Sequence, residues 1–215
     1  MTRSFQLYYI TDRNQLRAST LDAAIGRAIA AGVDWVQIRE KDLPARDLLG
    51  LTEVAVQQAR RQGSTRVMVN DRLDVALAAK ADGVHLGSRS MPAEVVRKVA
   101  PGEFVVGVSC HSLQDAVAAE AAGANYILLG PVFETPSKLQ YGPPLGVAKL
   151  REVTSRVSIP VLALGGITVD RAALCRQNGA AGIAGIRIFQ DCDSVDEIVR
   201  TLREEAGKQS PPSRE

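Results

Sequence analysis

Side chains that bind anions follow one of the short apolar runs in this chain of 215 residues. Gln37, Arg39 and Lys41 stand at every second position there, and Lys138 lies in a later loop. Amide, guanidinium and ammonium donors that converge on one point are suited to a diphosphate. Residues 37, 39 and 41 alternate as on a strand, so we expect them to point the same way. The alternative for either lysine alone is a solvated surface position.

His111 is the candidate acid–base group of the chain. It follows Ser109 out of an apolar run, and an imidazole exchanges protons near neutral pH. The other histidine, His85, also ends an apolar run but is interpreted as a hydrogen-bonded structural residue. Neither has a partner at metal-ligand spacing, so a histidine zinc site is not expected.

Two glycine-containing segments near the C-terminus have the composition of a phosphate site. Gly165 and Gly166 follow one apolar run, and the segment 182–187 ends in Ile186 and Arg187. Glycine lets backbone N–H groups approach an anion closely, and a helix N-terminus adds a favourable dipole. The alternative is that the glycine pair only forms a tight turn.

The segment 130–146 is predicted to be a substrate lid. It carries the carboxylate of Glu134, the hydroxyls of Thr135 and Ser137, and the ammonium of Lys138 between several prolines. Long loops inside compact domains are usually functional or disordered. Thr135, Ser137 and Lys138 are therefore expected to contact substrate, and a solvated surface loop is the alternative.

Apolar runs of strand length alternate with segments of helical periodicity along the whole chain. The eight runs span residues 7–10, 35–38, 67–69, 84–86, 104–108, 126–129, 161–164 and 183–186. This alternation predicts parallel strands covered by helices, and eight units in this length predict the α/β class and a single (β/α)8 TIM barrel. We expect the barrel over residues 1–206 and a disordered tail over 207–215. The polar groups above would meet at the C-terminal ends of the strands, where such barrels have their active sites.

The bulk composition excludes several classes of function. The chain is 46% hydrophobic and 23% charged, with a net charge of +2, so no strong field attracts nucleic acid or an anionic membrane. No apolar run reaches membrane-spanning length, and we expect no signal peptide, because the first residues are too polar for one. Its three cysteines suit reduced thiols. A cytoplasmic enzyme is expected, and the sequence leaves open whether it forms a homo-oligomer.

A set of short motifs occurs in a fixed order over about residues 6–206. They are Tyr8-Tyr-Ile-Thr-Asp12, Gln37-Ile-Arg-Glu-Lys41, Asn70-Asp-Arg72, Ala81-Asp-Gly-Val-His-Leu-Gly87, Gly107-Val-Ser109, Gly130-Pro-Val-Phe133 with Thr135-Pro-Ser-Lys138, and Leu164-Gly-Gly-Ile167. Together they resemble the thiamin phosphate synthase and TenI-type family. Its known members are (β/α)8 barrels of late thiamin biosynthesis. The synthase joins hydroxymethylpyrimidine diphosphate to a thiazole phosphate and expels pyrophosphate with Mg²⁺, whereas the TenI-type relative aromatises a carboxythiazole phosphate by moving a proton.

The resemblance implies a role for each strand-end residue. The residues that would hold a diphosphate are Arg39, Lys41, Asn70 and Lys138. Gln37 and Ser109 would line a pyrimidine pocket, and Gly166 with the turn after the eighth apolar run, at Ile186, would hold the thiazole phosphate. Arg187, where synthases tend to have a serine, adds a cation at the phosphate end. Asp71 would be a metal ligand if Mg²⁺ binds.

One motif departs from the synthase pattern. Synthases usually read His-Leu-Gly-Gln-x-Asp where this chain reads His-Leu-Gly-Ser-Arg-Ser90, so a serine replaces the second metal carboxylate. The loop Phe133-Glu-Thr135 resembles the tautomerase version, and His111 stands where the resemblance places the acid–base group. These residues predict a TenI-type thiazole phosphate tautomerase, an isomerase with His111 and Glu134 as catalytic residues and no required cofactor.

Two alternatives stay open. Asn70-Asp-Arg72 keeps the synthase form, so the protein could be a thiamin phosphate synthase, a transferase that uses Mg²⁺ and tolerates Ser90. A third reading is a non-catalytic ligand-binding or regulatory barrel. The expected partner is a phosphorylated thiazole in each enzyme reading, with a pyrimidine diphosphate added for the synthase.

Overall fold

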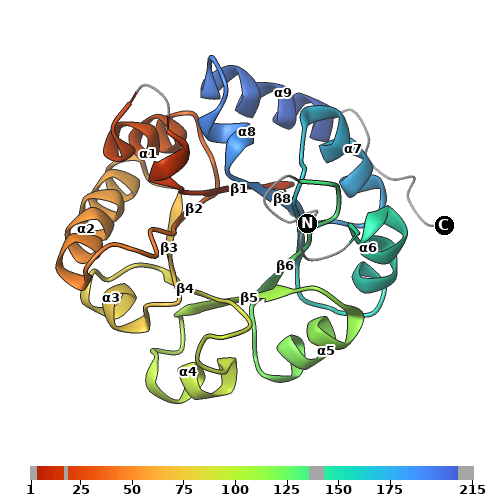
Figure 1. Cartoon of the computed structure of the whole chain (residues 1–215), viewed down its shortest axis with the longest axis horizontal. Helices are drawn as coiled ribbons and strands as arrows, with labels where there is room; N and C mark the ends of the chain where they lie inside the picture. The colour runs from red at the N-terminus through yellow and green to blue at the C-terminus, as the bar shows by residue number, and fades with distance from the viewer. Residues whose placement is uncertain (1–3, 17–18, 136–142, 208–215) are drawn as a thin grey trace.

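Eight parallel strands close into a barrel in sequence order, as Figure 1 shows in a view down the barrel. The computed structural model describes residues 4–16, 19–135 and 143–207. The strands are β1 (Gln6–Ile10), β2 (Trp35–Ile38), β3 (Arg66–Asn70), β4 (Gly83–Leu86), β5 (Val105–Cys110), β6 (Tyr126–Leu129), β7 (Val161–Leu164) and β8 (Gly182–Gly185). The predicted (β/α)8 barrel is therefore confirmed.

Helices cover the outside of the barrel between successive strands (Figure 1). They are α1 (Leu21–Ala30), α2 (Ala45–Gln62), α3 (Leu73–Ala78), α4 (Ala93–Val99), α5 (Leu113–Ala121), α6 (Gly146–Thr154), α7 (Val169–Gln177), α8 (Arg187–Gln190) and α9 (Val195–Gly207). The hydroxyls of Thr20, Ser112 and Thr168 accept backbone N–H groups at the starts of α1, α5 and α7. Such caps satisfy donors that have no partner within the helix.

The strand residues divide into two clusters because successive side chains point to opposite faces. One cluster lies between strands and helices and includes Leu7 and Ile127. The other lies inside the barrel and includes Tyr8, Met68 and Tyr126. Side chains therefore fill the barrel interior, and ligands have access from its ends.

The predicted strands agree with the observed ones to within one or two residues, and the last strand is shifted by one residue at each end. Ile186 was expected to end the eighth strand, but β8 stops at Gly185. The backbone of Ile186 has φ −96° and ψ −70° and forms the N-cap of α8. The chain turns there because Arg187 already begins a helix.

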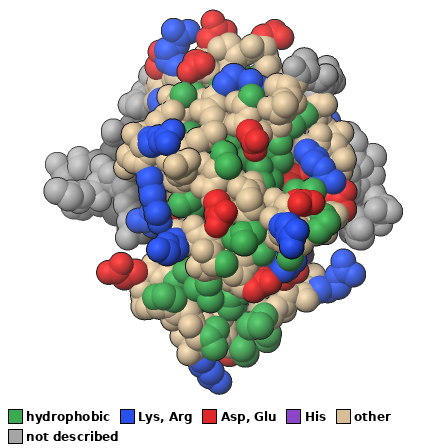
Figure 2. All heavy atoms as spheres, turned by 90° about the vertical axis from the view of Figure 1, so that its left-hand side faces the viewer, with side chains coloured by type: hydrophobic (Ala, Val, Ile, Leu, Met, Phe, Trp, Pro, Cys, Tyr) green, Lys and Arg blue, Asp and Glu red, His purple; other side chains and the backbone are tan. Residues whose placement is uncertain are grey.

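The outer surface carries charges of both signs. On the face shown in Figure 2, basic and acidic side chains are interspersed with apolar ones, as the small net charge suggests. No helix in the described ranges is both long and apolar enough to cross a membrane. All three cysteines are free thiols, and burial raises the pKa of Cys110 and of Cys175 to about 12.

Candidate functional site

Gln37 and Asn70 join the ends of β2 and β3 inside the barrel mouth. The Gln37 amide Nε2 donates to Asn70 Oδ1 at 3.0 Å. The Gln37 side chain is buried, and its Oε1 has no hydrogen-bond partner among the described residues. A buried carbonyl without a donor is unfavourable, so Gln37 is ready to accept an N–H from a ligand.

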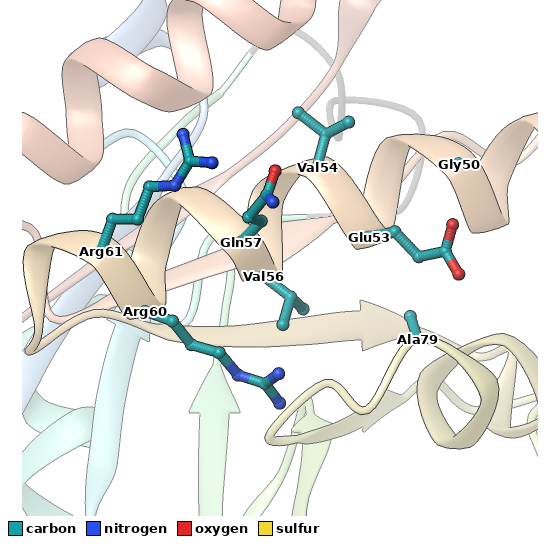
Figure 3. A pocket seen from close by; sticks show the side chains of 8 residues that line it. All are labelled: Gly50, Glu53, Val54, Val56, Gln57, Arg60, Arg61 and Ala79. Atoms are coloured by element: carbon teal, nitrogen blue, oxygen red, sulfur yellow. The ribbon is translucent and has the colours of Figure 1, made fainter.

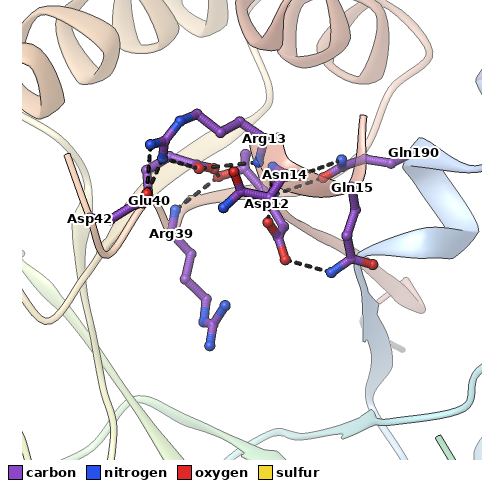
Figure 4. Close-up of polar contacts among 9 residues, drawn as sticks. Asp12, Arg13, Asn14, Gln15, Arg39, Glu40, Asp42 and Gln190 are labelled. Carbon is purple, nitrogen blue, oxygen red and sulfur yellow. Dashed lines mark hydrogen bonds and ion pairs between the residues drawn. The ribbon is translucent and has the colours of Figure 1, made fainter. Parts of the chain in front are cut away.

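Arg39 supplies an unpaired cation at the same edge. Its backbone N–H donates to Thr11 Oγ1 at 2.9 Å, and Thr11 Oγ1 donates to Glu40 Oε1 at 2.6 Å. Figure 4 shows the Arg39 guanidinium extending away from this cluster. The guanidinium makes no ion pair within the described part of the chain. It is therefore available to an anion.

Glu40 holds the loops after β1 and β2 together (Figure 4). This buried carboxylate accepts from the Arg13 backbone N–H at 3.1 Å, and the Arg13 side chain bridges Glu40 and Asp42. Arg13 beside Asp42 lowers the pKa of that carboxyl. Glu40 was assigned no role from the sequence. The only sequence feature that could have indicated its role is its position between Arg39 and Lys41.

The predicted alternation of residues 37, 39 and 41 is wrong beyond Gln37. β2 ends at Ile38, so strand geometry no longer sets the direction of the following side chains. Gln37 lies inside the barrel, Arg39 is half-buried, and Lys41 is exposed in a turn. The basic groups are near one another along the chain without sharing a strand face.

Asp71 is the carboxylate that the sequence predicts as a Mg²⁺ ligand. Its backbone has φ 65°, a left-handed conformation that is uncommon outside glycine, and its N–H donates to the His85 carbonyl at 2.8 Å. The side chain is exposed after β3. No group of three acidic, histidine or cysteine ligands occurs in the described ranges. Mg²⁺ fits only with substrate phosphates as further ligands, which is a common arrangement for this ion.

Ser90 is used locally in the structure. Its Oγ accepts from the Gly87 backbone N–H at 2.8 Å, which closes the turn after β4. The hydroxyl can offer a neutral oxygen but no charge. That this position belongs to a metal site stays a prediction.

His85 lies inside the barrel, where both of its ring nitrogens have hydrogen-bond partners. Its Nε2 is 2.8 Å from Ser109 Oγ, and its Nδ1 is 3.2 Å from the Tyr126 hydroxyl. The Tyr126 hydroxyl is in turn 2.7 Å from that of Tyr8. Burial, with a smaller contribution from the charge of Arg39, lowers the pKa of His85 to about 3. His85 is therefore neutral, and only Ser109 of this series reaches the mouth.

His111 is exposed at the end of β5. Its Nδ1–H donates to the Gly130 carbonyl at the end of β6. In the neutral ring this leaves Nε2 as a proton acceptor. Glu134 is also exposed, and the two side chains form no hydrogen bond with each other in the described structure. The structure thus orients His111 without assembling a His111–Glu134 pair.

The glycine pair after β7 packs directly beneath the loop that follows β6. A Cβ on Gly165 would lie 2.7 Å from Pro131 Cα, and one on Gly166 would lie 2.5 Å from the Glu134 carbonyl. Both glycines have positive φ, 96° and 64°. Close packing and backbone conformation already require these glycines, so their phosphate-binding role stays a prediction.

Backbone hydrogen bonds hold the start and end of the predicted lid. The Val132 N–H donates to the Leu164 carbonyl at 2.8 Å, and the Gly146 N–H donates to Val132 at 3.0 Å. Arg187 Nη2 donates to Thr135 Oγ1 at 3.4 Å, so two predicted substrate residues meet there. Ser137 and Lys138 lie outside the described residues, as does the tail 208–215.

A surface hollow of about 720 Å³ lies elsewhere, on the outer wall along α2. Figure 3 shows that Arg60 and Arg61 point to opposite sides of the helix. Glu53 and Val54 also line it. Its polar groups do not converge, whereas those at the strand ends do, so the mouth is the candidate site.

The family follows from these strand ends and from comparison with known proteins. The thiamine monophosphate synthase (TMP-TENI) family model matches residues 7–189. The chain belongs to this family. A thiamine-phosphate synthase of Clostridium novyi is 38% identical over 202 residues, 94% of this chain and 98% of the relative. One of Methanoculleus marisnigri is 41% identical over 200 residues, 93% and 94% of the two chains.

A solved structure of the same family has the same fold. Thiamine phosphate pyrophosphorylase from Pyrococcus furiosus superposes with a TM-score of 0.86 at 34% identity, over 96% of this chain and 98% of that chain. The resemblance to the synthase and TenI family is thereby confirmed. The preference for its TenI branch stays a prediction, since these relatives are named for the synthase reaction.

Proposed function

We propose that this protein is a thiamin phosphate synthase, which corresponds to the alternative rather than the favoured reading of the sequence. The observation that carries the proposal is the set of groups at the ends of β2 and β3: the Arg39 guanidinium, which has no ion-pair partner among the described residues, the Gln37–Asn70 pair and the exposed Asp71 carboxylate. A cation, amides and one carboxylate suit a diphosphate that shares a Mg²⁺ ion. The names of the near-full-length relatives support the same reaction.

In this proposal each residue of the site binds a different part of the substrates. Arg39 binds the diphosphate and stabilises charge on the departing pyrophosphate. Gln37 and Ser109 hold the pyrimidine, and Arg187 with Thr135 holds the phosphate of the thiazole. Asp71 would hold the Mg²⁺, which when bound neutralises part of the pyrophosphate charge. With both substrates fixed in one mouth, the coupling gains from their proximity.

A coupling assay with Mg²⁺ tests the proposal. Wild type should form thiamin phosphate and pyrophosphate. Arg39→Ala should lower kcat/KM by about 100-fold, since a charge-assisted contact contributes about 1.5–3 kcal/mol. Arg156→Ala, which removes an exposed arginine before β7, should change the rate less than about twofold. Absence of coupling by wild type would sink the proposal.

Ser90→Asp tests the metal site separately. Restoring a carboxylate should lower the Mg²⁺ concentration needed for half-maximal coupling, because Mg²⁺ prefers anionic oxygen. Ser90→Asn is the matched control, because asparagine has the size of aspartate but no charge. Equal Mg²⁺ requirements for the two variants would show that position 90 does not face the metal.

The tautomerase is the second candidate, and the orientation of His111 favours it. Its Nδ1 is occupied by the Gly130 carbonyl, so Nε2 is presented as a base, and proton transfer needs no metal. Wild type should then aromatise carboxythiazole phosphate and His111→Gln should not. Equal rates with and without protein would exclude it. Binding of thiamin phosphate with neither activity would favour the non-catalytic barrel.

A further inference from the structure

A line of hydrogen bonds runs from the closed interior of the barrel to its mouth. It joins Tyr8 to Tyr126 at 2.7 Å, Tyr126 to His85 at 3.2 Å and His85 to Ser109 at 2.8 Å. Tyr8, Tyr126 and His85 are 0%, 3% and 2% exposed. Ser109 is half-buried at the outer end. The first three groups must therefore satisfy one another, whereas the fourth can also bond to a ligand.

The buried end fixes the direction in which the protons point. Among the described residues, the Tyr8 hydroxyl has only the Tyr126 oxygen as a partner. The nearby Trp35 offers no acceptor, because an indole N–H is a donor only, and it donates to Gln6 Oε1 at 2.8 Å. If Tyr126 donated to Tyr8, the Tyr8 proton would be buried without an acceptor, which is unfavourable. Tyr8 therefore donates to Tyr126.

Each following proton is then determined. Tyr126 has His85 Nδ1 as its remaining acceptor, so Nδ1 carries no proton. The ring nitrogens contact only Tyr126 and Ser109 among the described residues, and a ring whose Nδ1 accepts a hydrogen bond is neutral. A neutral imidazole with a bare Nδ1 has its proton on Nε2, and that proton is donated to Ser109 Oγ. The hydroxyl proton of Ser109 is left to point outward.

We propose that Tyr8 and Tyr126 begin a directional hydrogen-bond chain in which Tyr126 is a positioning residue that holds the proton of His85 on Nε2 and makes Ser109 a donor toward the mouth. Ser109 thus selects a ligand that presents an acceptor, such as a ring nitrogen, and disfavours one that presents an N–H there. Only this consequence for the ligand rests on the proposed function, because it identifies the acceptor as part of the pyrimidine.

The test is ¹⁵N NMR of histidine-labelled full-length protein at pH 7. The chain has two histidines, so a His111→Gln sample assigns both signals. The expected wild-type spectrum shows His85 neutral, with a protonated Nε2 and an unprotonated Nδ1. A proton on Nδ1, or a cationic ring, would overturn the proposal.

Two matched variants locate the residue that fixes the proton. Tyr8→Phe and Tyr126→Phe each remove one buried hydroxyl. In Tyr8→Phe, Tyr126 still has only Nδ1 to donate to, so the wild-type form of His85 should persist. In Tyr126→Phe, the donor to Nδ1 is lost. A mixture of the two neutral tautomers of His85, one with the proton on Nδ1 and one with it on Nε2, should then appear. A wild-type spectrum from Tyr126→Phe would refute the positioning role. If that variant does not fold, the proposal still requires the Nε2–H form in wild type and in Tyr8→Phe.

Calorimetric binding of hydroxymethylpyrimidine diphosphate measures the consequence for the ligand. Tyr126→Phe should weaken binding about two- to threefold, in proportion to the fraction of the protein in which Ser109 donates to a bare Nε2 instead of the ligand, and Tyr8→Phe should bind as the wild type does. Equal affinities of the two variants would refute the selection by Ser109. A wild type without coupling activity would count against the proposed function, whereas the NMR result decides the proton position independently.

Discussion

His85 shows how one side chain can be structural and still lie at the site. Its imidazole is buried among aromatic rings, stacked on Tyr126 with ring centroids 5.7 Å apart. In the sequence, only the apolar neighbours of His85 distinguish its role from that of His111. The structure separates them by environment: burial lowers the pKa of His85 to about 3, and His111 is exposed. The buried histidine therefore keeps a single protonation state in the folded protein at neutral pH.

The buried histidine makes stability depend on pH. In the unfolded chain it titrates near 6.5, and in the folded chain near 3. Between these values the unfolded state binds more protons, so the free energy of unfolding falls as the pH is lowered. Its contribution is fully present above pH 6.5, and about 2 kcal/mol of it should be lost between pH 7.5 and 5.

Urea unfolding at the two pH values checks this prediction. His85→Gln keeps a polar side chain without the titration, so its loss on acidification should be smaller than that of wild type by about 2 kcal/mol. If both proteins lost the same amount, His85 would not be the group responsible.

At the scale of elements, glycines decide how closely strands and loops approach the interior. Gly107 in β5 faces the ring of Tyr126, and a Cβ there would lie 2.1 Å from Tyr126 Cζ. The backbone conformation of β5 does not require a glycine at position 107. The neighbouring β6 requires it, because Tyr126 occupies the space inside the barrel that a side chain at position 107 would need.

Gly107→Ala should therefore destabilise the protein by about 3 kcal/mol through overpacking. Gly50→Ala is the control, since Gly50 lies on the exposed side of α2 with no atom within 4 Å of an added Cβ. That change should stabilise by about 0.5–1 kcal/mol, because alanine favours a helix interior. Denaturant unfolding should thus give shifts of opposite sign, and shifts of the same sign would contradict the assignment.

For the whole molecule, Arg203 on α9 ties the C-terminal helix to the first strands of the barrel. It donates to the carbonyls of Phe5 at 2.6 Å and Gly32 at 3.0 Å, and it pairs with Asp34 at 2.7 Å. Asp34 also accepts the Leu7 N–H at 2.6 Å. Residues from both ends of the described chain thereby meet at the N-terminal ends of β1 and β2.

Arg203→Ala should lower the free energy of unfolding by about 2–4 kcal/mol, because it removes the cation that pairs with Asp34 and the side-chain donor to two carbonyls. Arg200→Ala removes an arginine that is 69% exposed and 4.0 Å from Glu204, and should cost less than about 0.5 kcal/mol. Urea titrations of both variants measure the difference. A similar cost for both would show that α9 does not support the barrel through Arg203.

The sequence alone determined the barrel and most of the strand-end residues. Strands and helices have local periodicities, so their number and order can be counted, and polar residues after apolar runs mark the mouth. The departure at Ser90 was also visible, because it is one residue in a motif. These features depend on short stretches of chain.

Only the tertiary structure decided which groups meet. Tyr8 and Tyr126 are 118 positions apart and bond inside the barrel, and Glu40 is buried because Thr11 and Arg13 reach it from another loop. The glycine pair after β7 proved to be required by the loop after β6. Such contacts depend on how strands close into a barrel, and no local pattern encodes the distance between two strands. The physical reason is that periodicity sets the direction of a side chain, whereas packing selects its partner.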